Sequence, residues 1–158
     1  MRSKSTEDSK SILAELVLPS QANPAGNVHG GEIIKLMDNC AGVAAQKHCR
    51  SNVVTARVDE LKFRLPVLVG SLVTCQAQVI YTGSTSMEVF VTVEAEDLMR
   101  ENGPQIALTA FFTMVALDEE GHPTPVAPIA MEGMSTYDKK LYEEGKKRYL
   151  SHKSHKHS

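Results

Sequence analysis

The sequence predicts an α+β fold with a five-stranded antiparallel sheet, one long helix after the first strand, and an outer C-terminal helix. Three observations predict it. Residues 30–48 carry apolar side chains at the three-and-four spacing of one helix face. A long run of alternating apolar and polar residues follows, as in strands with one buried face. The segment from Ser135 to about Leu150 is charged and helical in pattern, with Ser135 as its N-cap.

Length and composition fit a single globular domain. The chain has 158 residues, of which 42% are hydrophobic and 23% charged. A formal net charge of −2 gives no bulk attraction to nucleic acid, and the apolar run at residues 107–117 is too short to span a membrane. We therefore expect the protein to bind neither nucleic acid nor a membrane. The domain is expected at residues 11–150, between a flexible N-terminus at 1–10 and a disordered His/Lys/Ser tail at 151–158.

Cysteine usage and the N-terminus indicate a cytoplasmic protein. Cys40, Cys49 and Cys75 are odd in number and form no CxxC pair, so we expect reduced thiols rather than a disulfide framework. The first ten residues are not followed by the apolar segment of a secretory signal. Cys49 with His48 and His29 lacks the spacing of a metal site, which favours buried, satisfied side chains. No metal or cofactor is expected.

The expected strands differ in which of their faces are apolar. Residues 53–65 switch apolar parity near Asp59-Glu60, which predicts a β-bulge. Gly83-Ser84 separates two alternating segments and predicts a hairpin turn. The last strand is apolar on both faces, as in a strand inside a sheet. The expected strands are residues 12–18, 53–65, 73–81, 87–95 and 106–117.

The number of helices bears on the oligomeric state. One helix can cover only part of one face of a five-stranded sheet, so an edge or a face of the sheet would stay exposed. An exposed sheet edge offers unpaired backbone groups to another chain, and an exposed apolar face attracts a partner. The sequence therefore predicts a dimer.

Asp38 points most clearly to chemistry. At about 100° per residue, the helix has an apolar arc with Asp38 at its margin, where a carboxylate is partly desolvated. Gly31 lies two turns before it and Gly42 one turn after it, on nearly the same side of the helix. The helix surface on either side of the acid therefore lacks side chains, and another chain or a ligand could approach there. The structural alternative is that both glycines permit close helix–sheet packing while Asp38 bonds a strand-edge amide. The arc contains Ile33, Ile34, Met37, Ala41, Ala44 and Ala45.

The start of the same helix adds two groups. Gly30-Gly31 leaves backbone N–H groups free at the positive end of the helix dipole, where they can hold a developing oxyanion. Asn23, in a structured loop at residues 19–29, offers a donor and an acceptor to a water or a carbonyl. Together with Asp38 these groups suffice to hydrolyse an activated ester. His29 is a second candidate base, with capping or packing at the helix start as its structural alternative.

The segment from Asn23 to Asp38 resembles the hotdog-fold acyl-CoA hydrolases, both the small bacterial proteins and the tandem-domain brain-type enzymes. Its sequence is Asn-Pro-Ala-Gly-Asn-Val-His-Gly-Gly-Glu-Ile-Ile-Lys-Leu-Met-Asp. An isolated His-Gly-Gly would be a weak motif, but this element together with the later segments is fairly specific. The likeness covers roughly residues 12–150 and continues through Val54-Thr-Ala-Arg-Val-Asp59, Phe63-Arg-Leu-Pro66, Gly70, Tyr81-Thr-Gly-Ser-Thr-Ser86 and Glu143-Glu-Gly-Lys-Lys-Arg-Tyr149.

The resemblance implies a curved antiparallel sheet wrapped around a long central helix, with two protomers joined into one continuous sheet. Three such dimers often make a hexamer. The implied reaction hydrolyses acyl-CoA to a free fatty acid and CoA, which enters and leaves as part of substrate and product. The implied site lies at the dimer interface, with Asn23 from one protomer and Asp38 from the other. Gly31 N–H would polarise the thioester carbonyl, Asp38 would activate water or attack directly, and Asn23 would orient water or substrate.

CoA also needs cations for its phosphates and a slot for pantetheine. A solvated strand face explains Lys62 and Arg64 about as well as CoA binding does. Arg57 and the turn at residues 83–86 are therefore the better supported CoA-binding residues. Two alternatives remain: a hotdog dehydratase of 3-hydroxyacyl thioesters, which would use His29 and Asp38 across the interface, and a non-catalytic acyl-CoA-binding module. The expected substrate-binding residues are His29, Gly30, Arg57, Lys62, Arg64, Gly83, Ser84, Thr85 and Ser86.

Overall fold

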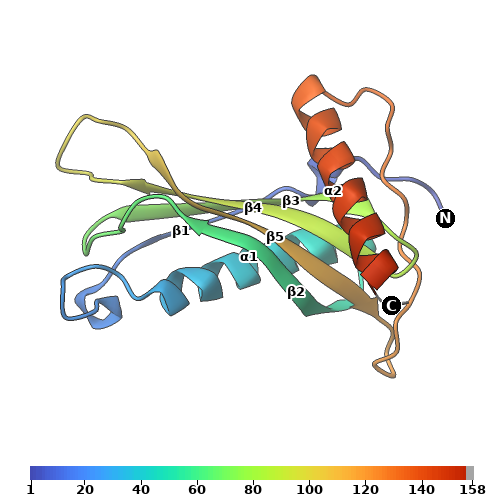
Figure 1. The fold of residues 1–158 in the computed structure, drawn as a ribbon, viewed down its shortest axis with the longest axis horizontal. Helices are drawn as coiled ribbons and strands as arrows, with labels where there is room; N and C mark the ends of the chain where they lie inside the picture. Colours follow the sequence, from blue (N-terminus) through green and yellow to red (C-terminus); the bar gives the residue numbers. More distant parts are fainter. Residues whose placement is uncertain (156–158) are drawn as a thin grey trace.

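A computed structural model describes residues 1–155 and confirms the α+β fold of five antiparallel strands and two long helices. Helix α1 runs along one face of the sheet and α2 lies across the other face, near one end (Figure 1). In chain order the elements are η1 (Thr6–Ser9), β1 (Ser11–Leu16), η2 (Pro19–Gln21), α1 (Gly30–Cys49), β2 (Asn52–Phe63), β3 (Leu72–Thr82), β4 (Ser86–Glu96), β5 (Gln105–Leu117) and α2 (Thr136–His155).

The strands lie in the order β1-β3-β4-β5-β2, and every neighbouring pair is antiparallel. The last predicted strand is therefore internal, as expected, and β2 is an edge strand. Its register shifts between Asp59 and Lys62, where Glu60 adopts a left-handed φ of 49°, so the predicted bulge is confirmed. A second shift between Thr55 and Arg57 was not predicted.

The core lies between α1 and the sheet face that it covers. Alternate residues of β3 and β4 point into it, beginning with Val73 and Met87, as the period-two pattern predicts. Asp38 stands at the margin of the buried stripe of α1 and is half-buried, as expected. The apolar residues that α1 buries are Ile33, Leu36, Met37, Cys40, Ala41, Ala44 and Ala45.

Helix α2 approaches the other face of the sheet through glycines. A Cβ on Gly145 would lie 2.7 Å from Tyr81 Cβ and 3.0 Å from Ile80 Cγ1, and a Cβ on Gly83 would overlap the Tyr149 ring. Side chains at either position would push the helix off the sheet. The predicted N-cap is confirmed, because the Asp138 amide donates to Ser135 Oγ at 3.0 Å.

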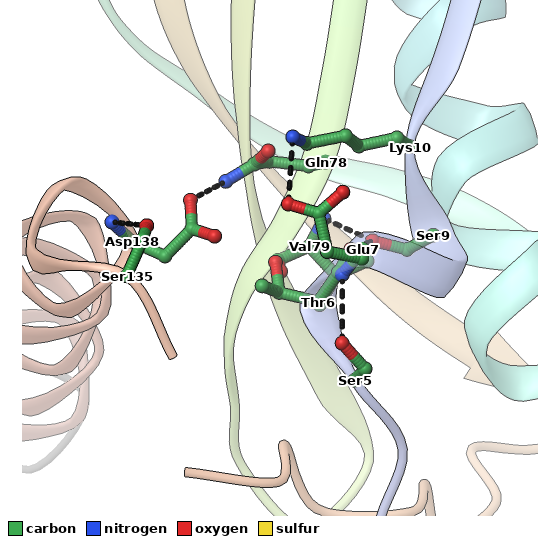
Figure 2. A network of polar contacts seen from close by, with 9 residues as sticks. All are labelled: Ser5, Thr6, Glu7, Ser9, Lys10, Gln78, Val79, Ser135 and Asp138. Atoms are coloured by element: carbon green, nitrogen blue, oxygen red, sulfur yellow. Dashed lines mark hydrogen bonds and ion pairs between the residues drawn. The ribbon is translucent and has the colours of Figure 1, made fainter. Parts of the chain in front are cut away.

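The prediction of a flexible N-terminus is wrong for residues 4–9 (Figure 2). Strand β1 starts only at Ser11, so its pairing with β3 stops short of Val79. Ser9 Oγ accepts a hydrogen bond from the Val79 amide at 2.8 Å, and Thr6 Oγ1 donates to the Val79 carbonyl. These side chains replace the missing strand partner, since buried backbone groups need partners, and they hold η1 against the sheet.

The prediction of a disordered tail is wrong for residues 151–155, because α2 continues through His155. Its last turns are anchored by His152, whose Nε2 lies 2.8 Å from Asp59 Oδ2 on β2. Residues 156–158 lie outside the described part of the chain. Among the helices of residues 1–155, none is long and apolar enough to cross a membrane.

Candidate active site

Asp38 is held by the edge strand. Thr55 Oγ1, on β2, donates a hydrogen bond of 2.6 Å to Asp38 Oδ1 and also lies 3.3 Å from Met114 Sδ. Within residues 1–155, Asp38 Oδ2 accepts no hydrogen bond. Asp38 therefore bonds a strand hydroxyl rather than the amide that the structural alternative required. One of its oxygens is fixed, and the other is open to a water or an acyl group.

The loop before α1 uses the side-chain oxygen of Asn23 for its own fold. Asn23 Oδ1 accepts hydrogen bonds from the amides of Ala25 at 2.9 Å and Asn27 at 3.1 Å, and the Asn23 amide donates to the Asn27 carbonyl at 2.7 Å. The side-chain NH₂ is the part of Asn23 that a substrate can use, as a donor. Asn23 is thus presented by a rigid turn at the start of α1.

The start of α1 is open. His29 is its N-cap residue, yet within the described chain the His29 imidazole makes no cap hydrogen bond, so the proposed capping role of this side chain is wrong. Gly31 is exposed, and apart from its chain neighbours and the nearby backbone of its own helix, no atom of residues 1–155 lies within 4 Å of a Cβ built on it. Gly30 instead lies under Phe63, whose Cζ would be 3.1 Å from a Cβ there. Gly31 N–H is therefore the more accessible donor.

Two groups of the predicted site are well separated within one chain. Gly31 and Asp38 are seven residues apart on α1, which is about 10 Å along the axis at 1.5 Å per residue. A carbonyl oxygen held at Gly31 N–H would therefore lie roughly that far from Asp38 of the same protomer. The residues form two separate sets: Asn23, His29 and Gly31 at the helix start, and Asp38 with Thr55 further along.

The residues predicted to bind CoA are partly brought together. Arg57 and the turn at Ser84–Ser86 line one cavity of about 680 Å³, on the sheet face under α2. Gly83 is not in the wall of this cavity but is covered by Tyr149. Lys62 and Arg64 lie outside it: Lys62 Nζ is 3.8 Å from Glu60 Oε2, and Arg64 Nη2 is 3.5 Å from Thr109 Oγ1.

The same cavity contains a buried carboxyl group and a half-buried imidazole that the sequence did not single out. Glu88 is 1% exposed, accepts a hydrogen bond of 2.8 Å from Thr113 Oγ1, and has its pKa raised to about 7 by burial. His152 lies between Asp59 and Glu88, with Nδ1 3.6 Å from Glu88 Oε1, and burial lowers its pKa. Glu88 occupies a polar position in an alternating strand, and nothing in that pattern distinguishes it from a solvated glutamate.

The metal alternative finds no support in the geometry. His29 and His48 stand at opposite ends of α1, and His48 is buried with Nε2 2.6 Å from the Ala127 carbonyl oxygen. Ser51 Oγ donates to Cys49 Sγ at 3.3 Å. Over residues 1–155 no group of three or more His, Cys, Asp or Glu side chains is arranged to hold a metal ion.

Comparison with known proteins identifies the family. A family model described as the thioesterase superfamily matches residues 25–101. An uncharacterised acyl-CoA thioester hydrolase of Bacillus subtilis is 36% identical over 126 residues, which cover 80% of this chain and 73% of that protein. The chain belongs to the thioesterase superfamily. A superfamily relative, the rat cytosolic acyl coenzyme A thioester hydrolase, is 41% identical over 147 residues, 92% of this chain but only 38% of the relative.

Solved structures confirm the hotdog fold of the superfamily. A hexameric acyl-CoA thioesterase superimposes with a TM-score of 0.90 at 35% identity, over 98% of this chain and 97% of that one. The Staphylococcus aureus acyl-CoA hydrolase, solved with butyryl coenzyme A, gives 0.87 at 31% identity, over 97% and 92%. Alanine variants of that enzyme replace an asparagine, an aspartate and a threonine, and the intervals between them equal those separating Asn23, Asp38 and Thr55.

Proposed function

We propose that this protein hydrolyses acyl-CoA thioesters to a carboxylic acid and CoA. The observation that carries the proposal is the half-buried Asp38, fixed by Thr55 at one oxygen and open at the other, in a chain of the thioesterase superfamily. The Staphylococcus aureus enzyme, whose substituted residues have the spacing of Asn23, Asp38 and Thr55, supports assigning the site to these three residues.

The active site is proposed to be shared by two protomers. Gly31 and Asp38 of one chain lie about 10 Å apart along α1, so they would serve different sites. Strand β2 is an edge strand, and its exposed apolar residues Val54 (47%) and Val58 (40%) suit burial against a second copy. The proposed homodimer extends the sheet through β2. Each of its sites is formed by Asn23 and Gly31 of one protomer and Asp38 of the other. The hexameric relatives support a trimer of such dimers.

In the proposed reaction, Gly31 N–H at the positive end of α1 binds the thioester oxygen and stabilises negative charge as it develops there. Asp38 Oδ2 accepts a proton from a water whose oxygen attacks the carbonyl carbon, and Asn23 NH₂ orients the water or the acyl group. The C–S bond breaks, and the CoA thiolate takes up the proton. Direct attack by Asp38 would form an anhydride that water opens to the same products.

The test is thiol release from a panel of acyl-CoAs. Asp38→Ala and Asn23→Ala are each expected to lower kcat on the order of 100-fold or more, because each removes a group that acts in the transition state. Circular dichroism checks that both variants fold. Absence of turnover by the wild type on every acyl-CoA, or full activity in both variants, would refute the assignment.

A mixing experiment tests the shared site. After unfolding and refolding of equal amounts of Asp38→Ala and Asn23→Ala protein together, half of all dimers should be hybrids of the two variants. Each hybrid has one intact site, so about a quarter of wild-type activity should return by random pairing. The same treatment of either variant alone is the control. No recovery would show that Asn23 and Asp38 act within one chain.

The reaction as proposed requires no cofactor, and CoA takes part only as a portion of substrate and product. Activity should therefore persist after dialysis against a chelator, and loss that a metal restores would contradict this. The rat relative is named cytosolic, and we propose the same compartment for this protein. Cell fractionation tests that assignment.

A further inference from the structure

Thr55 stands where strand β2 is least constrained. Strand β2 lies at the edge of the sheet, so within the described chain only β5 pairs with it. Thr55 pairs with Met114 on β5. The register shifts before Arg57, so Ala56 forms a bulge next to Thr55. A threonine side chain has more than one staggered rotamer, and the orientation of the Thr55 hydroxyl therefore depends on its neighbour on β5.

Met114 is that neighbour, and it contacts both the hydroxyl and the underside of α1. Its Sδ lies 3.3 Å from Thr55 Oγ1, and the residue is 2% exposed. The other end of its side chain reaches α1, because a Cβ built on Gly42 would lie 3.8 Å from Met114 Cε. Gly42 follows Asp38 by about one helical turn. Met114 therefore fills the space between Thr55 and the part of α1 that carries Asp38.

The Thr55 hydroxyl has one proton and two acceptors within reach. Asp38 Oδ1 lies 2.6 Å away, and Met114 Sδ lies 3.3 Å away. An ionised carboxylate is a strong acceptor and a thioether sulfur is a weak one, so the proton points to Asp38. The methionine takes up the volume into which the hydroxyl would otherwise turn, and because it is buried it keeps water from competing for that proton.

We propose that Met114 is a positioning residue of the active site. Its side chain holds the Thr55 hydroxyl on Asp38 Oδ1 and so leaves Oδ2 free for the reacting water or acyl group. Met114 acts through Thr55 and does not itself contact the substrate. Its effect on the rate rests on the proposed function, whereas its effect on the orientation of Thr55 does not. The sequence did not single it out, since Met114 is one of many apolar residues in a strand that is apolar on both faces.

Met87 provides a matched control. It is the partner of Met114 on β4, belongs to the same core and is 0% exposed. Strand β5 lies between it and β2, which places its position roughly 10 Å from that of Thr55. Replacing either methionine by alanine leaves a cavity in the core, so both variants should have a lower Tm than the wild type. Only Met114→Ala removes the contact with Thr55.

The first test is steady-state hydrolysis of butyryl-CoA by the two variants. Met114→Ala should lower kcat about tenfold with KM nearly unchanged, because Thr55 then no longer orients the reacting carboxylate. Met87→Ala should keep kcat within about twofold of the wild type. Equal losses of kcat in the two variants would show an effect of core packing alone. That result, or an unchanged kcat in Met114→Ala, would overturn the proposal.

A double-mutant cycle shows whether Met114 acts through Thr55. In a Thr55→Ala background, Met114→Ala should lower kcat no further, because the hydroxyl that it positions is already absent. Losses that multiply would mean that Met114 affects the rate by another route, and the proposal would fail. Met114→Leu keeps most of the side-chain volume and should retain kcat within about threefold of the wild type. A loss as large as that of Met114→Ala would show that filling this volume is not what holds Thr55.

Crystal structures of the two alanine variants separate this inference from the proposed function. In Met114→Ala, Thr55 should adopt a second rotamer in which Oγ1 no longer donates to Asp38. In Met87→Ala the bond of 2.6 Å should persist. If the wild type hydrolyses no acyl-CoA while Thr55 moves only in Met114→Ala, the proposed function fails and the positioning role is supported. If the wild type is active and Thr55 keeps its bond in Met114→Ala, the positioning role fails and the proposed function is unaffected.

Discussion

The two faces of the sheet are covered by helices of the same length and opposite character. Helix α1 and helix α2 each have 20 residues. The α1 face is an apolar core in which the proposed catalytic carboxylate stands at the margin. The α2 face buries titratable and polar side chains, among them Gln78, Glu88 and Asp138. Burial of apolar surface dominates the contacts of α1, to which Ser11 and the buried His48 add polar ones, whereas α2 depends mainly on specific contacts.

Those contacts are of two kinds. Glycines let α2 approach the strands closely, and charged side chains connect it to them. Arg148 lies with its guanidinium carbon 3.7 Å from the Phe111 ring centre, and its Nη2 is 2.9 Å from Glu60 Oε1 and 3.0 Å from Glu144 Oε1. The guanidinium thereby ties α2 to the bulge of β2. The comparison predicts that the packing of α2 changes with the ionisation of Glu88 and with single added atoms, and that the apolar part of α1 is less sensitive to both.

The largest expected effect is the change in the free energy of unfolding when Glu88 is replaced. Its folded-state pKa of about 7 exceeds the ordinary value of 4.5, so the folded state favours the protonated form. The stability linked to that proton is complete below pH 4.5, falls as pH rises toward 7, and is lost above it. Glu88→Gln should raise the free energy of unfolding at pH 8 by at most about 3 kcal/mol and change it little at pH 4.5.

Urea denaturation of wild type and Glu88→Gln at both pH values measures this difference. Glu94→Gln, in a less buried position on the same strand, is the matched control for replacing a glutamate by glutamine. A Glu88→Gln variant that is less stable than the wild type at pH 8 would mean that ionised Glu88 is well compensated, and the two faces would then be more alike than we infer.

Added methyl groups should distinguish the helices next. Gly145→Ala forces a contact with Tyr81 and Ile80 and should lower the free energy of unfolding by about 2 kcal/mol through overpacking. Gly42→Ala on α1 would place its Cβ 3.8 Å from Met114 Cε, an ordinary contact, and should raise stability by up to about 1 kcal/mol. Destabilisation by Gly42→Ala would indicate that a partner protomer packs closely against α1.

The α1 face could be predicted from the sequence because its signals are periodic. Apolar spacing in residues 30–48 and alternation in β3 and β4 report directly which side chains are buried. The position of Asp38 relative to that arc was predictable for the same reason. Its partner Thr55 was not, because their hydrogen bond depends on how edge strand β2 lies beside α1, which no local pattern specifies.

The α2 face shows where this reasoning fails. A buried glutamate and a solvated one occupy the same polar position in an alternating strand, so Glu88 had no distinguishing signal. The residues after Leu150 are charged and polar in composition, and their helix is stabilised by the tertiary contact of His152 with Asp59. The N-terminal residues likewise are ordered by partners on β3 that the local sequence cannot show.

Two threonines on opposite faces allow a matched comparison of function. Thr55 donates to Asp38, and Thr113 donates to Glu88. Thr55→Ala should lower kcat about tenfold with KM nearly unchanged, because it removes the hydrogen bond that orients the reacting carboxylate. Thr55→Ser keeps the hydroxyl and should retain the kcat of the wild type. Thr113→Ala should leave kcat unchanged. Steady-state kinetics with butyryl-CoA measures kcat and KM for each variant. A loss of kcat in Thr113→Ala would place the α2 face in the chemical step.

The smallest expected effects concern how the two helices begin. Helix α2 is capped by Ser135, and Ser135→Ala should cost about 1 kcal/mol of unfolding free energy. Helix α1 begins at His29 without a side-chain cap within residues 1–155, which leaves its first amides available to substrate. His29→Ser should therefore stabilise the fold by about 0.5–1 kcal/mol and lower kcat, because the new hydroxyl would compete for the Gly31 amide.

His29→Ala separates this effect from loss of the imidazole, since alanine cannot cap the helix. If His29→Ala retains activity while His29→Ser gains stability and loses activity, the open start of α1 is a requirement of the site and His29 is not its base. If both variants lose activity equally, the imidazole itself takes part in the reaction. The contrast between the capped and the uncapped helix would then be incidental to function, and Asp38 would share its role with a second titratable group.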